Sequence, residues 1–168
     1  RSIYNCRELL CTLFNFDKPD HVIFTPNITY SLNILFQSIL KPNWHVITSS
    51  MEHNSVLRPL LAAKDKLGIE LDIVPADNKG LISIELLKSY IKPETKLVIL
   101  SHGSNVTGTV QPLEEIGNLC KINNIYFIID SAQTAGALPV DFKALNANAI
   151  AFTGHKGLWG EVEPGKWS

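Results

Sequence analysis

Short apolar runs alternate with segments of helical periodicity along almost the whole of the 168-residue chain. Residues 125–129 form an almost wholly apolar run, as expected of a strand that helices cover on both faces. Residues 28–40, in contrast, carry their apolar side chains at helical spacing. A repeated order of strand, helix and strand is typical of βαβ units. We therefore predict an α/β fold with a mostly parallel sheet flanked by helices.

The same periodicity gives the expected elements and their ends. We predict strands at residues 21–25, 45–48, 70–74, 96–100, 125–129 and 147–152. We predict helices at residues 1–16, 28–40, 56–67, 84–91 and 113–123. Gly68 and Pro93 end two of these helices, and Ser83 is placed to cap a third.

The composition is that of a globular domain, with 45% apolar residues, 18% charged residues and a formal net charge of −1. The chain has no basic block and no apolar run of ~18–20 residues, which argues against nucleic acid and membranes as partners. Three cysteines cannot all pair within one chain, and the five histidines lack metal-ligand spacing. We therefore expect a reducing, cytoplasmic location and no metal site.

Polar clusters follow five of the predicted strands at their carboxyl ends, where parallel sheets collect ligands. The clusters are residues 25–29, 51–54, 101–105, 130–133 and 153–156. Because the carboxyl ends of parallel strands meet at one rim of a sheet, we expect all five clusters to converge there.

Lys156 and Asp130 carry the most specific chemistry in these clusters. A desolvated lysine amine can attack an aldehyde and form a Schiff base, as lysines do with pyridoxal phosphate (PLP), although an isolated loop lysine is more often an ordinary surface residue. Asp130 ends an apolar strand, and its carboxylate needs a partner there. That partner could be a pyridinium N–H, the next turn, a metal or a phosphoryl group.

The other clusters offer weaker signals of the same kind. Thr29 lies at a predicted helix start, which favours a phosphate but also suits an ordinary cap. His53 could stack on a planar ring and exchange protons, or it could be a solvated loop residue. Asn105 and Gln133 could orient a phenolic oxygen or a substrate carboxylate, or they could serve turns.

In this order, the clusters resemble the class V aminotransferases, and most closely the cysteine desulfurase and selenocysteine lyase subgroup. The resemblance runs from about Tyr4 to Gly160 and rests above all on Asp130-Ser131-Ala132-Gln133 and Gly154-His155-Lys156. It implies the large domain of a PLP-dependent transferase with the aspartate aminotransferase-like fold. Residues 1–168 would be a partial PLP-binding domain that lacks an N-terminal segment and a C-terminal small domain.

The resemblance also implies a role for each site residue. Lys156 would be the Schiff-base lysine, Asp130 the partner of the pyridine nitrogen, and His53 the ring-stacking residue that helps proton transfer. Gln133 would contact the phenolic oxygen, and Asn105 would face that oxygen or the substrate carboxylate. The phosphate would be held by the side chains of Thr29, Thr153 and His155 and by the backbone N–H of Ile28.

The implied reaction is the removal of sulfur from cysteine, as a persulfide, by a homodimer that serves a sulfur-acceptor protein. Family members continue for roughly another chain of this size, as a second domain would. That part carries the sulfur-accepting cysteine and a carboxylate-binding arginine, so we expect this chain to be catalytically incomplete. Residues 161–165 depart from the family's Pro-x-Gly-x-Gly sequence, and Pro26-Asn27 replaces a Gly-rich approach to the phosphate.

Three alternatives stay open at this point. The first is an aminotransferase or lyase of the same fold that acts on another amino acid. The second is a doubly wound phosphate-binding module without PLP, in which Asp130 is a metal or phosphoryl site and Lys156 has no role. The third is a truncated, non-catalytic product that only folds.

Overall fold

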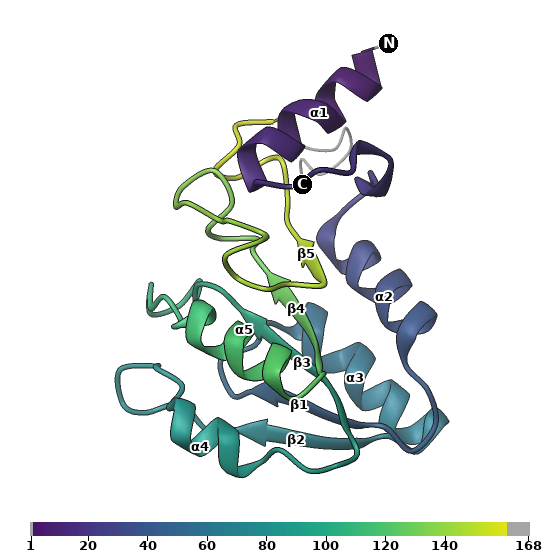
Figure 1. Ribbon diagram of the computed structural model, residues 1–168, viewed down its shortest axis with the longest axis vertical. Coiled ribbons are helices and arrows are strands. Elements are labelled where there is room, and N and C mark those ends of the chain that lie inside the picture. The colour runs from purple at the N-terminus through teal and green to yellow at the C-terminus, as the bar shows by residue number, and fades with distance from the viewer. Residues whose placement is uncertain (1, 161–168) are drawn as a thin grey trace, which may run out of the picture.

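The computed structural model describes residues 2–160, which form a five-stranded sheet with helices on both faces (Figure 1). The strand order is β2-β1-β3-β4-β5, and all four pairings are parallel. The prediction of an α/β fold with a parallel sheet is therefore confirmed. The strands are β1 (His45–Ser49), β2 (Glu70–Val74), β3 (Thr95–Ser101), β4 (Tyr126–Asp130) and β5 (Ala149–Ala151).

Two pairs of helices cover the two faces of the sheet. Helices α2 (Ile28–Ile39) and α3 (Asn54–Leu67) pack on one face, whereas α4 (Ile84–Ser89) and α5 (Leu113–Ile122) pack on the other. Helix α1 (Ser2–Phe14) lies beyond the β5 edge and adds Phe14 to the core on the α4–α5 side. It is followed by a short 3-10 helix, η1 (Pro19–His21).

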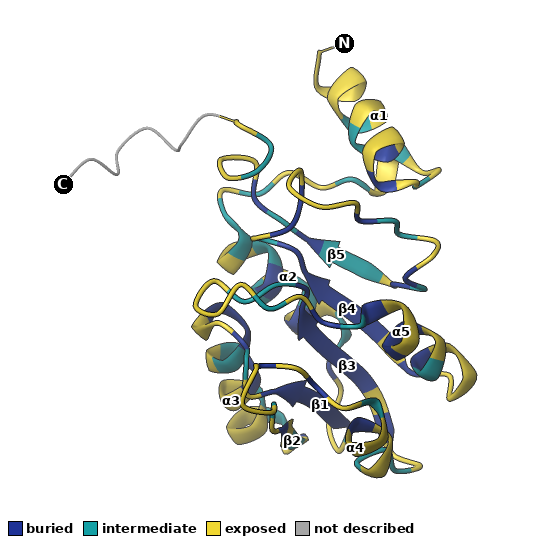
Figure 2. Cartoon of the chain, turned by 90° about the vertical axis from the view of Figure 1, so that its left-hand side faces the viewer, coloured by how far each residue is buried: buried dark blue, intermediate teal, exposed yellow. Residues whose placement is uncertain are grey.

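The apolar runs of the central strands arise because these strands are covered on both sides. Leu97 and Ile99 of β3 belong to the core under α2 and α3. Val98 and Leu100 belong to the core under α4 and α5, since successive side chains point to opposite faces. All four are fully buried, and each contributes roughly 1.5–3 kcal/mol by leaving water. Figure 2 shows this buried central sheet and the exposed outer faces of the helices.

Local capping explains where several helices begin and end. Asn27 accepts the backbone N–H of Tyr30 at 2.9 Å at the start of α2. Ser83 caps α4 by accepting the N–H of Leu86 at 3.3 Å, as predicted. Gly68 ends α3 with a left-handed φ of 67°, also as predicted.

The predicted strand at residues 21–25 is wrong. His21 ends η1, and the residues after it have no regular secondary structure. Ile23 and Phe24 are 75% and 51% exposed, so this apolar run lies outside the core and pairs with no strand of the described chain. The other predicted elements are present, with ends that differ by a few residues.

Residues 161–165, where the sequence departs from the family pattern, lie outside the described residues. Within residues 2–160, none of the helices combines the length and the apolar character that a membrane crossing needs.

Candidate active site

A pocket opens at the carboxyl ends of the central strands. Ser101 at the end of β3 pairs with Asp130 at the end of β4, and Asp130 pairs with Ala151 at the end of β5. The chain leaves β1 and β3 toward opposite faces, which makes this rim a topological switch point. The pocket is lined by Ile28, Met51, His53, Ser55, Ser101, Gly103, Asn105, Asp130, Ala132, Gln133 and Lys156.

Each of the five polar clusters contributes at least one residue to this lining. Six of the residues assigned to the site from sequence line the pocket, namely Ile28, His53, Asn105, Asp130, Gln133 and Lys156. The other three, Thr29, Thr153 and His155, are not among the lining residues. Thr29 is exposed in the first turn of α2, beside Ile28. Thr153 is buried, and its Oγ1 lies 3.3 Å from Nδ1 of His155.

Asp130 is a buried carboxylate with spare capacity to accept hydrogen bonds. Its Oδ1 accepts the backbone N–H of Ala132 at 3.0 Å, and within the described chain no donor reaches Oδ2. Burial raises the pKa of Asp130, whereas the Ala132 N–H and the nearby side chains of His53 and Lys156 act in the opposite direction. A cationic donor in the pocket would therefore stabilise the charged form of this carboxyl group. This is the environment that a protonated pyridine nitrogen requires.

His53 is held in place by the start of α3. As the N-cap residue, it accepts the backbone N–H of Ser55 on Nδ1 at 3.1 Å, and the same nitrogen lies 2.9 Å from Oγ of Ser55. Because Nδ1 acts as an acceptor, the neutral ring carries its proton on Nε2. The ring thus lines the pocket with one nitrogen engaged by the protein and the other left for a ligand.

Lys156 lies in the loop that follows β5, and it lines the pocket while remaining exposed. The expected desolvation of its amine is therefore not seen. The pocket is open on this side, since no element of the described chain covers Lys156. The loop itself is held closely, because a Cβ on Gly157 would lie only 2.4 Å from the carbonyl oxygen of Ala135.

Glu52 is the residue of this site whose importance sequence reasoning missed. Only 9% exposed, it accepts the hydroxyl of Ser49 at 2.6 Å, and the hydroxyl and backbone N–H of Ser101 at 2.7 Å and 2.9 Å. Burial, with a smaller contribution from the charge of Asp130, raises its pKa to about 7 against the hydrogen bonds from both serines. The available signal was a carboxylate next to His53, with serines at the ends of two predicted strands.

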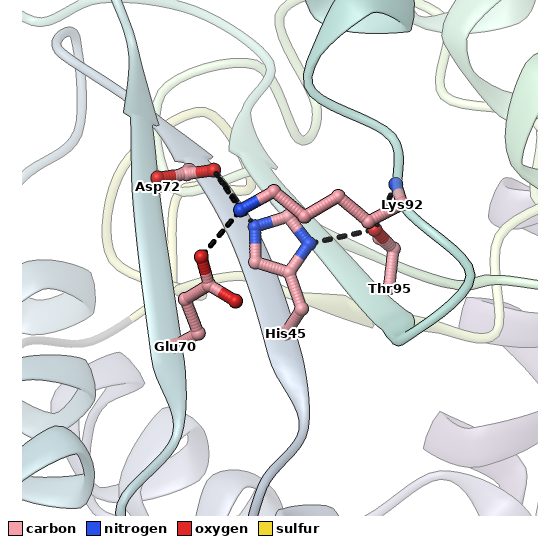
Figure 3. Close-up of polar contacts among 5 residues, drawn as sticks. All are labelled: His45, Glu70, Asp72, Lys92 and Thr95. Carbon is pink, nitrogen blue, oxygen red and sulfur yellow. Dashed lines mark hydrogen bonds and ion pairs between the residues drawn. The ribbon is translucent and has the colours of Figure 1, made fainter.

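A second polar cluster lies at the opposite rim, where β1, β2 and β3 begin (Figure 3). Nδ1 of His45 lies 2.6 Å from Oγ1 of Thr95, and its Nε2 lies 2.9 Å from Oδ2 of Asp72. Ligand atoms of His45, Glu70 and Asp72 lie within 4.8 Å of one another, a spacing that could suit a metal ion. The ammonium of Lys92 already pairs with Glu70 and lies 3.3 Å from Asp72, so the protein supplies its own cation there. The cluster joins three strands and is separate from the pocket.

The family of this chain is decided by comparison with known proteins. The family model described as Aminotransferase class-V matches residues 1–161. The chain belongs to this family. A mitochondrial cysteine desulfurase of Arthroderma benhamiae is 35% identical to it over 156 residues, which is 89% of this chain and 31% of that relative. The chain thus spans about a third of the length of the curated relatives it matches.

Solved structures of similar proteins confirm the predicted fold. The apo cysteine desulfurase of Thermococcus onnurineus NA1 matches with a TM-score of 0.89 and 32% identity, over 95% of this chain and 40% of that one. A mutant of C-DES with glycine covalently linked to its PLP cofactor matches with a TM-score of 0.86 and 30% identity, over 95% of this chain and 43% of that one. The resemblance to PLP-dependent cysteine desulfurases is confirmed.

The predicted cytoplasmic location is wrong by the same comparison. The matched relatives from Arthroderma benhamiae, Candida albicans and Saccharomyces cerevisiae are mitochondrial enzymes. The prediction rested largely on unpaired cysteines, and Cys6, Cys11 and Cys120 are indeed free in the described chain. Free thiols indicate only a reducing environment and do not specify a compartment.

Proposed function

We propose that residues 1–168 are part of the PLP-binding large domain of a cysteine desulfurase, and that Lys156 binds PLP covalently. The observation that carries this proposal is the meeting of Lys156, Asp130 and His53 in one pocket at the strand ends. PLP supplies, when bound, an electron sink for reactions at the α-carbon of an amino acid.

The pocket residues fit the ring of this cofactor. Oδ2 of Asp130 has no donor in the described chain, so it can accept an N–H from the pyridine nitrogen and keep that nitrogen protonated. His53 would lie against the ring and hold or move a proton at Nε2, because its Nδ1 already accepts from Ser55. Gln133 and Asn105 would orient the phenolic oxygen and the substrate carboxylate.

The start of α2 fits the phosphate group. The backbone N–H groups of Ile28 and Thr29 belong to the first turn of a 12-residue helix and have no intrahelical acceptor. The helix dipole adds a partial positive charge at this end. We infer that these two amides hold the phosphate, and that Thr153 and His155 add donors from the loop after β5.

Covalent trapping tests the central claim. The purified chain is mixed with PLP, its long-wavelength absorption is recorded, and the adduct is reduced with borohydride and mapped by mass spectrometry. The adduct should map to Lys156, and Lys156→Ala should lose both the band and the adduct. Lys121→Ala, which removes another exposed lysine, should keep both. An adduct of equal yield in Lys156→Ala would refute the proposal.

We infer further that the protein acts on cysteine as a homodimer and transfers sulfur to an acceptor protein. The support is the cysteine desulfurase relatives and SspA, solved in complex with cysteine, which matches with a TM-score of 0.86 and 31% identity. A protein of the relatives' full length should release sulfide from cysteine and sediment as a dimer. Transamination of alanine without sulfide release would favour an aminotransferase instead.

A further inference from the structure

Glu52 lies beside the pocket without lining it, and it joins the ends of β1 and β3 through Ser49 and Ser101. We propose that Glu52 is a positioning residue, whose carboxylate clamps the ends of β1 and β3 and thereby places His53 and Ser101 in the pocket wall. The effect of Glu52 on PLP binding rests on the proposed function. The hydrogen bonds that hold β1 and β3 together do not depend on it.

The clamp is a network of short, charge-assisted hydrogen bonds. Oε1 accepts the hydroxyl of Ser49, the last residue of β1, at 2.6 Å. Oε2 accepts the hydroxyl and the backbone N–H of Ser101, the last residue of β3, at 2.7 Å and 2.9 Å. Hydrogen bonds to a carboxylate are shorter and stronger than neutral ones, so the two strand ends are tied together by one side chain.

The segment after β1 is held at both of its ends. At the near end, the hydroxyl of Ser49 accepts the backbone N–H of Met51 at 3.2 Å while it donates to Glu52. At the far end, His53 caps α3 through its bond from Ser55. Met51, His53 and Ser55 all line the pocket, so a change at Glu52 reaches the pocket through its neighbours.

Glu52 also acts through its charge. The titratable group that acts on it directly is Asp130 at the end of β4, and Asp130 in turn lies near His53 at the start of α3 and Lys156 in the loop after β5. Its pKa of about 7 means that the carboxyl group changes charge near neutral pH. The ionised form places a second negative charge near Asp130, which favours a protonated ring nitrogen on a bound cofactor.

The first test uses the chain without PLP and follows backbone amides by NMR as the pH is changed. The chemical shifts of the Ser101 and Met51 amides should both change in one titration step near the pKa of Glu52. The Ser55 amide, which donates to the His53 ring, should show the same step. Glu52→Gln should abolish the step at all three amides, and Glu70→Gln, at the opposite rim, should keep it. A step confined to Ser101, or one that persists in Glu52→Gln, would overturn the proposal.

The second test uses the PLP-loaded chain and separates charge from clamp. Glutamine can still accept from Ser101 and donate to Ser49, so Glu52→Gln should keep the affinity for PLP within about threefold while the pH step in the absorption spectrum disappears. Glu52→Ala breaks the clamp and should weaken PLP binding about tenfold or more. An unchanged spectrum-against-pH profile in Glu52→Gln would overturn the role of the charge, and unchanged affinity in Glu52→Ala would overturn the clamp.

If the wild-type chain binds no PLP, the proposed function fails. The NMR titration still shows whether Glu52 holds the ends of β1 and β3 together, because it is recorded without PLP. If Glu52→Gln does not fold, Ser49→Ala takes its place, because it removes one bond that stabilises the carboxylate and leaves the charge. The step in the Ser101 and Ser55 amides should then move to higher pH, and a step at the same pH would overturn the proposal.

Discussion

Asp130 and Glu52 are two buried carboxylates at the same rim of the sheet, and their hydrogen bonds give them different roles. Both oxygens of Glu52 accept bonds from serines, so each already has a donor within the protein. Asp130 accepts only the Ala132 N–H within the described chain and keeps Oδ2 free. A carboxylate oxygen that has no donor and is open to a pocket can accept one from a ligand, whereas a carboxylate with protein donors on both oxygens favours a fixed structure. We therefore propose a binding role for Asp130 and a positioning role for Glu52.

At this scale, Glu52 predicts how stability changes with pH. Because burial raises its pKa from 4.5 to about 7, the folded chain retains a proton that the unfolded chain has lost between these values. Its contribution to the free energy of unfolding should fall as the pH rises through this window, by at most on the order of 3 kcal/mol. Urea unfolding at several pH values should show a flatter profile for Glu52→Gln than for the wild type. Equal slopes for the two proteins would contradict this reading.

At the scale of elements, two loops position the lysine by packing glycine against glycine. Gly136, in the loop after β4, has a φ of +80°, and a Cβ there would lie 2.5 Å from the carbonyl oxygen of Gly157. A Cβ on Gly157 would in turn lie 2.4 Å from the carbonyl oxygen of Ala135. The backbones meet directly, so no side chain fits between the two loops, and the loop of Lys156 is set by the loop of Asp130.

Gly157→Ala should therefore displace the loop that carries Lys156. The expected results are a loss of stability of about 1–3 kcal/mol and at least about tenfold weaker PLP binding. Gly154→Ala is the matched control, since nothing lies within 4 Å of a Cβ added there. Urea unfolding and PLP titration of both variants check this prediction. Equal stability and equal PLP affinity of the two variants would show that the contact of Gly157 with Ala135 does not position Lys156.

Across the whole molecule, the two rims of the sheet carry different groups of polar side chains. The carboxyl ends of the strands carry the pocket, and the amino ends carry the cluster of His45, Asp72 and Lys92 that ties β1 to its neighbours. At the pocket rim, Asp130 has one carboxylate oxygen that no donor of the described chain reaches. Charges at the opposite rim are paired with each other, so that end of the sheet stabilises the fold.

Asp72→Asn tests the stabilising role of that rim. Burial raises the pKa of Asp72, but hydrogen bonds and charges from His45 and Lys92 outweigh burial and leave the pKa below its ordinary value. The stabilisation is therefore present above the unfolded pKa of 3.8 and is lost as the pH falls through the lower folded value. The variant should lose on the order of 1 kcal/mol at pH 7 and progressively less in acid. Urea unfolding should show little change for Asp65→Asn, an exposed acid on α3, and an equal loss there would contradict the role of the cluster.

The sequence alone was sufficient for the parallel sheet, because strands covered on both faces must be apolar throughout, as residues 97–100 and 127–129 are. It also placed the polar clusters in order after the strands, which is why six of the residues that line one pocket could be named in advance. It misled at Ile23 and Phe24, because a strand needs a hydrogen-bonding neighbour and an apolar run does not specify one.

Tertiary structure alone decided which of these residues meet and how they are held. Glu52 bonds to Ser101, 49 residues away, and Gly157 packs against Ala135 from another loop, contacts that local periodicity cannot encode. The sequence determined the elements and the chemistry available at their ends. Only the three-dimensional packing left an oxygen of Asp130 without a donor and gave both oxygens of Glu52 donors from serines. Burial and hydrogen-bond partners depend on neighbours that are distant in the chain.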